Sequence, residues 1–233
     1  LVADTSAGAE SGARRLPGKK FAVKAQVHAG GRGRAGGVRI VDSVAAVGKA
    51  AGELLGQALV TEQTGPEGRR VQSVYVEEAV KADRNVYVAA LVDRQAAKVA
   101  LIGAAQGGED IEERMAADPS IIETLFLKPD GSATKQAFEG FARALDLKGP
   151  LAKKASALFE GLGKAFVEQD ASLIEINPLA VTASKELFAL DVKMVLDDNA
   201  MFRHPEARGL RDRDKLDPVE LEDLRRHVLD LHP

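Results

Sequence analysis

A lysine and a glycine-rich segment with two arginines lie close together near the beginning of the chain. Residues 21–37 read Phe-Ala-Val-Lys-Ala-Gln-Val-His-Ala-Gly-Gly-Arg-Gly-Arg-Ala-Gly-Gly. Glycines adopt backbone dihedral angles that are closed to other residues, so such a segment can bring amide N–H groups close to anionic oxygens. Lys24, Arg32 and Arg34 add positive charge. This combination is typical of a site that holds a polyphosphate.

The residues before the glycines predict an extended strand that presents Lys24 to the ligand. Successive side chains of a strand face opposite ways. Lys24 therefore shares one face with Gln26 and His28. The apolar residues of the alternation form the buried row on the other face: Phe21, Val23, Ala25 and Val27. A second strand-like run at 38–41 follows the glycines, so the geometry predicts a hairpin that covers a nucleotide.

One other reading of the glycine segment remains open, and two common glycine signatures do not match it. Gly-Arg-Gly-Arg also occurs in disordered nucleic-acid-binding tails. Here the motif occurs once and follows a strand, which favours an ordered loop. The segment also differs from a P-loop, which ends in Gly-Lys-Ser/Thr, and from a dinucleotide fingerprint, in which a helix opens at the third glycine.

A second group of polar residues lies near the end of the chain, in Leu-Ile-Glu-Ile-Asn-Pro-Leu at 173–179 and Ala-Leu-Asp-Val-Lys at 189–193. Glu175 and Asn177 share one face of a predicted strand. Across a hairpin that turns near Ser184, Asp191 would lie beside Asn177. Such oxygen ligands suit a magnesium ion that bridges phosphate oxygens. Alternatively, Glu175 and Asp191 are solvated residues on the exposed face of an antiparallel hairpin.

Strands and helices alternate along the chain in a pattern that predicts α+β lobes. Ser43 can cap a helix over 43–56, a helix begins after Gly108, and helical spacing returns at 151–169. Residues 1–20 show only weak helical patterning. The predicted strands beyond the glycine segment are 71–78, 85–92, 98–104, 172–182 and 187–194.

Composition limits the kind of partner this protein can have. The 233 residues carry a net charge of -3 and no cysteine, so an anion site must be local, and general nucleic-acid binding is not expected. No apolar run is long enough to span a bilayer. We expect a soluble intracellular protein that binds neither nucleic acid nor membrane.

Together with Asp-Asp-Asn-Ala-Met-Phe-Arg at 197–203, these motifs strongly resemble the ATP-grasp part of the beta subunit of succinate–CoA ligase and its relative malate–CoA ligase. The resemblance implies an α+β ATP-grasp fold with the nucleotide between two lobes. Residues 1–79 would form the smaller lobe with the phosphate loop, and residues 80–202 the larger lobe with the magnesium site. Residues 203–233 would be a charged linker towards an absent C-terminal CoA-ligase domain, with a possible helix at 219–231.

The resemblance also implies roles for individual residues. Glu175 would steady a phosphohistidine that the partner alpha subunit carries. Asn177 and Asp191 would bind Mg²⁺. The residues expected to contact the nucleotide, with Lys24 on its phosphates and Glu78 and Ala79 near its adenine, are Lys24, Gly31, Arg32, Gly33, Glu77, Glu78 and Ala79.

The implied reaction is phosphoryl exchange during acyl-CoA synthesis, with Mg²⁺ and ATP or ADP, and GTP as a further possibility. Its partner would be the alpha subunit that carries the phosphohistidine and the CoA site. His28 is then a loop residue, and His204, His227 and His232 are expected at the surface. The location would be the cytoplasm of a bacterium or the mitochondrial matrix of a eukaryote.

The sequence departs from the family at Asn85, where the family has a second glutamate near the nucleotide. The chain is also expected to lack the family's first strand and helix and its second domain, so that it would not complete the ligase reaction alone. An alternative is therefore a non-catalytic ATP-grasp module that binds nucleotide or a partner without turnover.

Overall fold

The computed structural model describes residues 1–209 of the chain, which divide into two compact units, residues 1–79 together with 206–209, and residues 80–205. None of the helices in residues 1–209 is both long and apolar enough to cross a membrane. The helix predicted at 219–231, His227 and His232 lie outside the described residues, as does most of the predicted linker.

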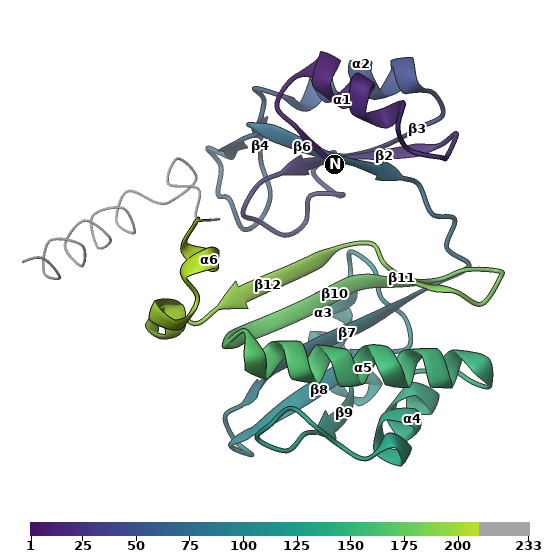
Figure 1. The fold of residues 1–233 in the computed structure, drawn as a ribbon, viewed down its shortest axis with the longest axis vertical. Helices are drawn as coiled ribbons and strands as arrows, with labels where there is room; N and C mark the ends of the chain where they lie inside the picture. Colours follow the sequence, from purple (N-terminus) through teal and green to yellow (C-terminus); the bar gives the residue numbers. More distant parts are fainter. Residues whose placement is uncertain (210–233) are drawn as a thin grey trace, which may run out of the picture. The chain divides into compact units, whose positions relative to one another are not determined.

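The first unit is a four-stranded sheet with two helices on one face, α1 and α2 (Figure 1). The strand order is β1-β6-β2-β3, and all neighbouring strands are antiparallel. A separate two-stranded ribbon, β4 and β5, follows α2. The elements are β1 (Val2–Ala3), α1 (Ser6–Ala13), β2 (Phe21–Gln26), β3 (Val38–Val41), α2 (Val44–Leu54), β4 (Ala58–Leu59), β5 (Arg69–Arg70) and β6 (Ser73–Glu78).

The strand and hairpin predicted around the glycine segment are confirmed. β2 pairs with β3 in antiparallel register, Phe21 opposite Val41 and Lys24 opposite Val38. Phe21, Val23 and Ala25 are buried in the core of this unit. Ser43 caps α2 through its hydroxyl, which accepts the amide N–H of Ala46. The alternation along β2 thus separates an apolar face under the helices from a polar face that carries Lys24.

Helix α1 is clearer in the structure than its sequence pattern suggests. Its residues are Ala, Gly, Ser and one Glu, so the apolar periodicity is weak. Thr5 caps the helix by accepting the amide N–H of Gly8. The Ser6 hydroxyl donates to the carbonyl of Gly48 in α2 at 2.6 Å. Small side chains allow the two helices to approach closely, and this packing supplies the stability that propensity does not.

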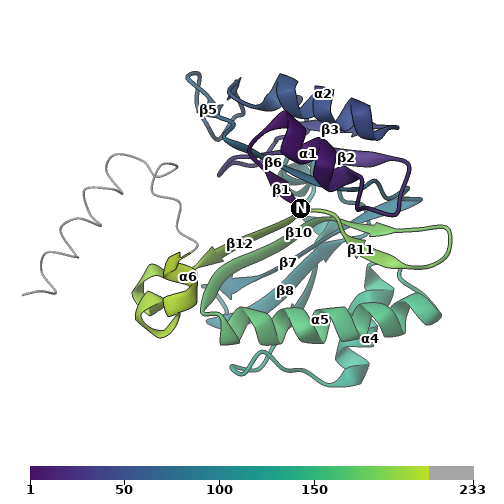
Figure 2. The ribbon, with the colours of Figure 1, turned by 45° about the horizontal axis from the view of Figure 1, so that its top comes forward.

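The second unit contains one antiparallel sheet and three α-helices. The sheet order is β11-β10-β7-β8-β9, and β12 also pairs with β10. Figure 2 shows α4 and α5 together on one face of this sheet. The elements are β7 (Arg84–Asp93), β8 (Lys98–Ala104), α3 (Ile111–Ala117), a 3₁₀ turn (Pro119–Ile121), β9 (Glu123–Phe126), α4 (Lys135–Ala144), α5 (Pro150–Glu168), β10 (Ala171–Val181), β11 (Leu187–Ala189), β12 (Val192–Leu196) and a 3₁₀ helix (Asp198–Arg203). The short helix α6 (Pro205–Gly209) follows, and all but its first residue is grouped with the first unit.

The larger core of the second unit lies between the sheet and helices α4 and α5. The rings of Phe141 and Phe159 meet edge to face with centroids 5.1 Å apart. A smaller cluster, with Tyr87, Ala89 and Ile111, covers part of the opposite sheet face. The hairpin predicted between 85–92 and 98–104 is confirmed as β7 and β8. Strand β9 and helix α4 have no counterpart in the sequence prediction.

The strand predicted at 187–194 is wrong as a single element, because it is two short strands interrupted at residues 190 and 191. Pro178 lacks an amide N–H, so the ladder along β10 cannot run through it unbroken. The register between β10 and β7 shifts between Ile176 and Leu179. On the other edge, Leu190 donates its amide N–H to the carbonyl of Pro178 at 3.1 Å. The irregular stretch of β10 around Pro178 therefore lies directly opposite the interruption between β11 and β12.

The expected surface position of His204 is also wrong. Its side chain is buried, and Nε2 lies 2.7 Å from the Oδ2 of Asp170. Arg203 donates to the other oxygen of the same carboxylate at 2.6 Å. Asp170 lies two residues after the end of α5. Its hydrogen bonds therefore hold the segment after β12 against the end of that helix.

Two glycines of α5 give a matched test of how closely this helix packs against the turn at Gly131. A Cβ at Gly163 would lie 2.3 Å from the carbonyl oxygen of Gly131, whereas a Cβ at Gly161 would meet nothing within 4 Å. We expect Gly163→Ala to lower the free energy of unfolding by about 1–3 kcal/mol. Gly161→Ala should raise it by up to about 1 kcal/mol. Urea unfolding of both variants checks this, and equal effects would contradict the contact.

Candidate functional site

Lys24 lies on the polar face of β2, where it is paired with Glu77. Its Nζ is 2.5 Å from Glu77 Oε1, and the two side chains are only 11% and 25% exposed. β2 and β6 are antiparallel, with Ala22 opposite Glu77, which places both charged side chains on one sheet face. An ammonium group this buried requires a partner. The structure thus brings together two of the residues predicted to contact nucleotide.

The glycine loop, residues 27–37, is an ordered turn between β2 and β3. Gly31 and Gly36 have φ of +70° and +73°, which strongly favours glycine. The amide of Gly37 donates to the carbonyl of Arg32 at 2.7 Å, and the amide of Ala25 donates to the carbonyl of Gly37 at the same distance. The Arg32 guanidinium donates to the carbonyl of Ala25 at 3.0 Å. The loop is therefore fastened to β2 on its C-terminal side.

The amide N–H groups of Gly31 and Gly33 donate no hydrogen bond within residues 1–209. Nearby backbone amides of one loop can form an anion-binding concavity when the loop holds them in place. Gly31, Arg32 and Gly33 are the loop residues for which the resemblance implies contact with the nucleotide, and the loop leaves the amides of Gly31 and Gly33 available.

Glu78 and Ala79 end β6. Glu78 is exposed, and its side chain lies over Gly18, where a Cβ would come within 2.5 Å of the Glu78 Cγ. The amide of Ala79 donates to the carbonyl of Lys20 at 2.8 Å. This bond fixes the backbone at the end of the strand. The place of Glu78 and Ala79 near the adenine stays a prediction.

In the second unit, Asn177 and Asp191 are neighbours, as the hairpin prediction requires. The amide N–H of Asn177 donates to the carbonyl of Asp191 at 3.1 Å. The Asn177 side chain makes two hydrogen bonds with the backbone of Gly108. Its Oδ1 accepts the Gly108 amide and its Nδ2 donates to the Gly108 carbonyl, both at 3.0 Å.

This carboxamide pair connects β10 to the turn that precedes α3. Gly108 has φ of +135°, a conformation that favours glycine. The Asn177 side chain therefore bonds to the backbone of Gly108 in the way that a neighbouring strand would, although the segment around Gly108 is not a strand.

Glu175 lies two residues before Asn177 on β10, and it is half-buried. Burial, together with the negative charges of Glu112 and Asp191, raises the pKa of the Glu175 carboxyl, against the opposing effect of Lys193 across the strand pair. The Tyr87 hydroxyl donates to Glu175 Oε2 at 3.4 Å. Burial and the nearby Glu175 raise the pKa of Tyr87, so the hydroxyl keeps its proton and remains a donor.

The oxygen donors near Asn177 fit a magnesium ion. Among the described residues, no group of three or more His, Cys, Asp or Glu side chains is placed to hold a metal. Mg²⁺ needs no such cage, because it keeps several waters and is usually held by one or two protein ligands together with substrate phosphates. Asp191 offers a carboxylate, and Asn177 Oδ1 keeps a second lone pair beside its bond to Gly108.

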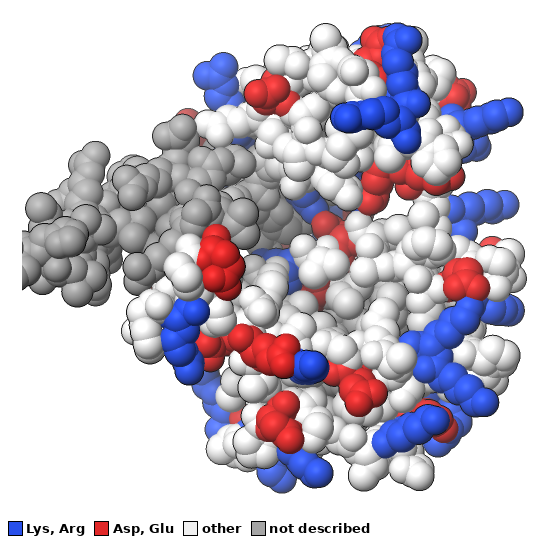
Figure 3. All heavy atoms as spheres, in the orientation of Figure 1, with Lys and Arg blue, Asp and Glu red and all other residues white. Residues whose placement is uncertain are grey.

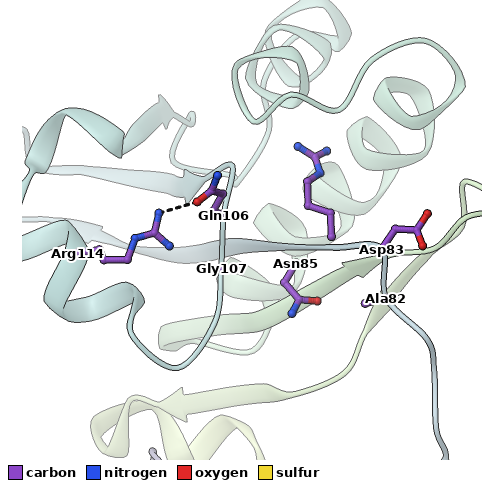
Figure 4. Close-up of a pocket in the computed structure, with 7 residues that line it drawn as sticks. Ala82, Asp83, Asn85, Gln106, Gly107 and Arg114 are labelled. Carbon is purple, nitrogen blue, oxygen red and sulfur yellow. Dashed lines mark hydrogen bonds between the residues drawn. The ribbon is translucent and has the colours of Figure 1, made fainter.

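Asn85 lines a cavity of about 340 Å³ in the second unit (Figure 4). Gln106 and Arg114, joined by a hydrogen bond of 3.0 Å, line it too. Oδ1 of Asn85 is buried and accepts no hydrogen bond in the described part of the chain. A buried acceptor without a donor is uncommon and costs free energy. This is the position where the resembled family has a glutamate, so the chain keeps an acceptor there but not the charge.

Charged side chains are interspersed elsewhere. On the face drawn in Figure 3, acidic and basic residues of the described part alternate in small groups. On this face, no long-range field of one sign is expected.

Comparison with known proteins identifies the fold family. A model of the ATP-grasp domain matches residues 1–181, which is most of the chain. The chain belongs to the ATP-grasp family. It is also 44% identical over 210 residues to the beta subunit of the ADP-forming succinate–CoA ligase of Janthinobacterium sp. (strain Marseille). That match covers 90% of this chain and 54% of the relative, so the chain spans about half the length of this protein. The resemblance read from the motifs is confirmed.

Solved structures confirm the α+β ATP-grasp fold. One is the dinucleotide-forming acetyl-coenzyme A synthetase 1 of Ca. Korarchaeum cryptofilum, in complex with coenzyme A, Ca-AMPCP and HgCl⁺, with a TM-score of 0.63, 17% identity and 84% of each chain covered. Another structure of that enzyme holds coenzyme A and Mg-AMPPCP, with its phosphohistidine segment pointing towards the nucleotide binding site. It has a TM-score of 0.58 and 17% identity, with 84% of each chain covered.

The sequence pattern does not predict the hydrogen-bond partners of the candidate site residues. It predicts a helix after Gly108 and a strand that contains Tyr87, and no more than that for these two residues. The alternation along β7 does place Tyr87 on the face of Ala89, the residue opposite Glu175, so a paired-strand reading could have found it. No local pattern signals that the Asn177 side chain bonds to Gly108, which is 69 residues away.

The Asn177 contact gives a prediction about the turn before α3. Asn177→Ala removes two hydrogen bonds to Gly108, each contributing about 1 kcal/mol. We expect a lower free energy of unfolding and faster hydrogen exchange at the Gly108 amide. Asn177→Asp keeps the acceptor for that amide but places a carboxylate oxygen against the Gly108 carbonyl, so it should protect the amide while still destabilising the protein. Unchanged exchange in Asn177→Ala would contradict this role.

Proposed function

We propose that this chain is the nucleotide-binding part of an acyl-CoA ligase of the succinate–CoA ligase beta-subunit type. In this proposal it exchanges a phosphoryl group between ATP and a phosphohistidine on an alpha subunit. The observation that carries the proposal is the arrangement in the first unit, where the buried Lys24 lies next to a glycine loop with unused amide donors. The beta-subunit relative, at 44% identity, supports the assignment.

The first unit supplies positive charge and amide donors for the phosphates. Lys24 pairs with Glu77. A phosphate oxygen near Nζ would share the ammonium with that carboxylate. Because phosphoryl transfer has a loose transition state with charge on the phosphate oxygens, positioning and electrostatic stabilisation carry most of the catalysis. Lys24 and the amides of Gly31 and Gly33 are suited to both.

The second unit supplies the metal ligands and a carboxylate for the phosphohistidine. Asp191 and Asn177 would hold Mg²⁺, which when bound neutralises charge on the phosphate oxygens. Glu175 would accept a hydrogen bond from the imidazole of the phosphohistidine, with Tyr87 holding the carboxylate in place. Two similar proteins support this part, since one is a beta subunit of succinate–CoA ligase and the other has a phosphohistidine segment that points towards its nucleotide binding site.

Nucleotide binding is the first test. We expect the full chain to bind ATP and ADP by calorimetry in a Mg²⁺-dependent manner, with GTP measured alongside. Lys24→Ala removes a charged donor, which contributes about 2 kcal/mol, so Kd should rise about thirtyfold. Arg34→Ala, which removes a charge from the loop but not from β2, should have a smaller effect.

Asp191→Ala examines the magnesium ligands in the same measurements. It should abolish the Mg²⁺ dependence while leaving metal-free binding unchanged. A wild-type chain that binds no nucleotide refutes the proposed function. Equal losses in Lys24→Ala and Arg34→Ala refute the special role of Lys24.

One observation favours a second candidate, a non-catalytic ATP-grasp module. Asn85 stands in place of the family's glutamate, and its buried Oδ1 has no donor in the described part of the chain. A site that has lost this charge could bind nucleotide and a partner subunit without turnover. Binding alone does not separate the two candidates, but phosphoryl transfer does.

Phosphoryl transfer from ATP to the alpha subunit of a related ligase decides between the candidates. For the enzyme, we expect labelled phosphate from ATP to appear on the alpha-subunit histidine. Glu175→Gln should reduce that transfer at least tenfold and leave ATP affinity within twofold, because Glu175 is proposed to contact the phosphohistidine and not the nucleotide. Nucleotide binding without any transfer by the wild-type chain would support the non-catalytic module.

A further inference from the structure

A turn outside the proposed nucleotide site is fastened to the glycine loop. The amide N–H of Gly30 donates to Oε1 of Gln63 at 2.8 Å, across 33 residues of sequence. Gly30 immediately precedes Gly31, whose amide donates no hydrogen bond in the described part of the chain. The Gln63 side chain therefore fixes the peptide next to the amides proposed to receive the phosphates.

The turn that carries Gln63 is itself strongly hydrogen-bonded. Thr61 Oγ1 accepts the amides of Gln63 and Thr64, both at 3.2 Å, and Thr64 Oγ1 accepts the amide of Thr61 at 2.8 Å. Short hydroxyl side chains stabilise turns in this way. Although Gln63 is exposed, Thr61 is buried. Gln63 thus extends from a rigid base.

Three glycines of the loop lie against this segment. A Cβ at Gly30 would lie 3.0 Å from Gln63 Nε2, and one at Gly37 would lie 2.7 Å from Leu59 Cδ2. A Cβ at Gly31 would lie 3.8 Å from the Cβ of Thr61. The absence of side chains at positions 30 and 37 is what allows this close approach.

The two sides of the glycine loop are fastened by different means. On the C-terminal side, backbone bonds join Gly37 to Arg32 and to Ala25. On the N-terminal side, the bond from Gly30 reaches the Gln63 side chain instead. Glycine loses more conformational freedom on ordering than any other residue. Without this bond the peptide between Gly30 and Gly31 would sample more conformations, which binding would then have to restrict.

We propose that Gln63 is a positioning residue for nucleotide binding, one that holds the amides of Gly31 and Gly33 in the orientation that receives a polyphosphate. The inference rests on the proposed function, because it takes the ligand of the loop to be the phosphates of a nucleotide. Gln63 itself does not contact the ligand. Its amide is neutral, so it accepts the Gly30 N–H without repelling an anion.

The test uses the full chain and three variants. Gln63→Ala removes the acceptor, whereas Gln63→Glu keeps an acceptor oxygen and adds a negative charge. Gln57→Ala is the matched control, because it removes the same amide from an exposed position whose side chain makes no hydrogen bond in residues 1–209. Thermal unfolding establishes that all three variants are folded, which we expect because both positions are exposed.

Hydrogen exchange of the nucleotide-free chain, followed by NMR, measures the contact directly. We expect the Gly30 amide to exchange about three- to tenfold faster in Gln63→Ala, the range expected for one lost hydrogen bond. It should stay protected in Gln63→Glu and in Gln57→Ala. Unchanged exchange in Gln63→Ala overturns the inference.

Nucleotide titrations measure the consequence. For Gln63→Ala, Kd for ATP should rise about three- to tenfold, while Kd for adenosine stays unchanged because adenosine carries no phosphate. In Gln63→Glu, the added charge should weaken ATP binding even though Gly30 remains protected. Gln57→Ala should change neither affinity. A parallel loss of ATP and adenosine affinity in Gln63→Ala would indicate a general structural role and overturn the inference.

Failure of the inference and failure of the proposed function give different results. A wild-type chain with no preference for ATP over adenosine overturns the proposed function, and with it the nucleotide role of Gln63. A wild-type chain that shows the preference, while Gln63→Ala retains it in full, overturns only the inference.

Discussion

Lys24 in the first unit, and Glu175 and Asn177 in the second, lie on strands that are hydrogen-bonded along both edges. β2 lies between β6 and β3, and β10 lies between β7 and the pair β11 and β12. Such strands are held more rigidly than edge strands or loops, and this suits them to position side chains. The constraint is that one face of each strand must be apolar for the core, so every polar group on the other face needs a partner.

The partners found in the structure meet that requirement. Lys24 is paired with Glu77, Glu175 accepts from Tyr87, and the Asn177 amide is matched by the backbone of Gly108. A partly buried charge without its partner would destabilise the fold by several kcal/mol. The same groups that are proposed to bind nucleotide and metal are therefore part of the stability of each sheet. Asn85 is the exception, because its buried Oδ1 has no donor in residues 1–209.

The parts of the fold that depend on neighbours in sequence were predictable. Alternation gave β2 with its buried row, and turn residues gave the hairpin of β7 and β8. Ser43 marked the start of α2. The position of Asp191 beside Asn177 also followed from the hairpin, since antiparallel pairing fixes which residues meet. The wider ATP-grasp fold came from the order of several motifs rather than from any one of them.

The parts that depend on distant residues were not predictable. α1 has too little apolar periodicity and is stabilised by its packing on α2. His204 was expected at the surface, because nothing near it in sequence indicates the carboxylate of Asp170, 34 residues earlier. Pro178 is visible in the sequence, but the interruption opposite it, between β11 and β12, involves residues on the neighbouring part of the sheet. In each of these cases the decisive interaction joins residues that only the folded chain brings together.

Both glycine-rich segments are held by a carboxamide side chain from elsewhere in the same unit, Gln63 for Gly30 and Asn177 for Gly108. A glycine-rich segment cannot fix its own conformation, because it has no side chains to pack and loses much entropy on ordering. A carboxylate could accept the same amide, but it would repel the phosphate oxygens proposed to bind nearby. A lysine or arginine could not accept the amide at all. A carboxamide can therefore fix a backbone amide beside an anion site without adding charge to it.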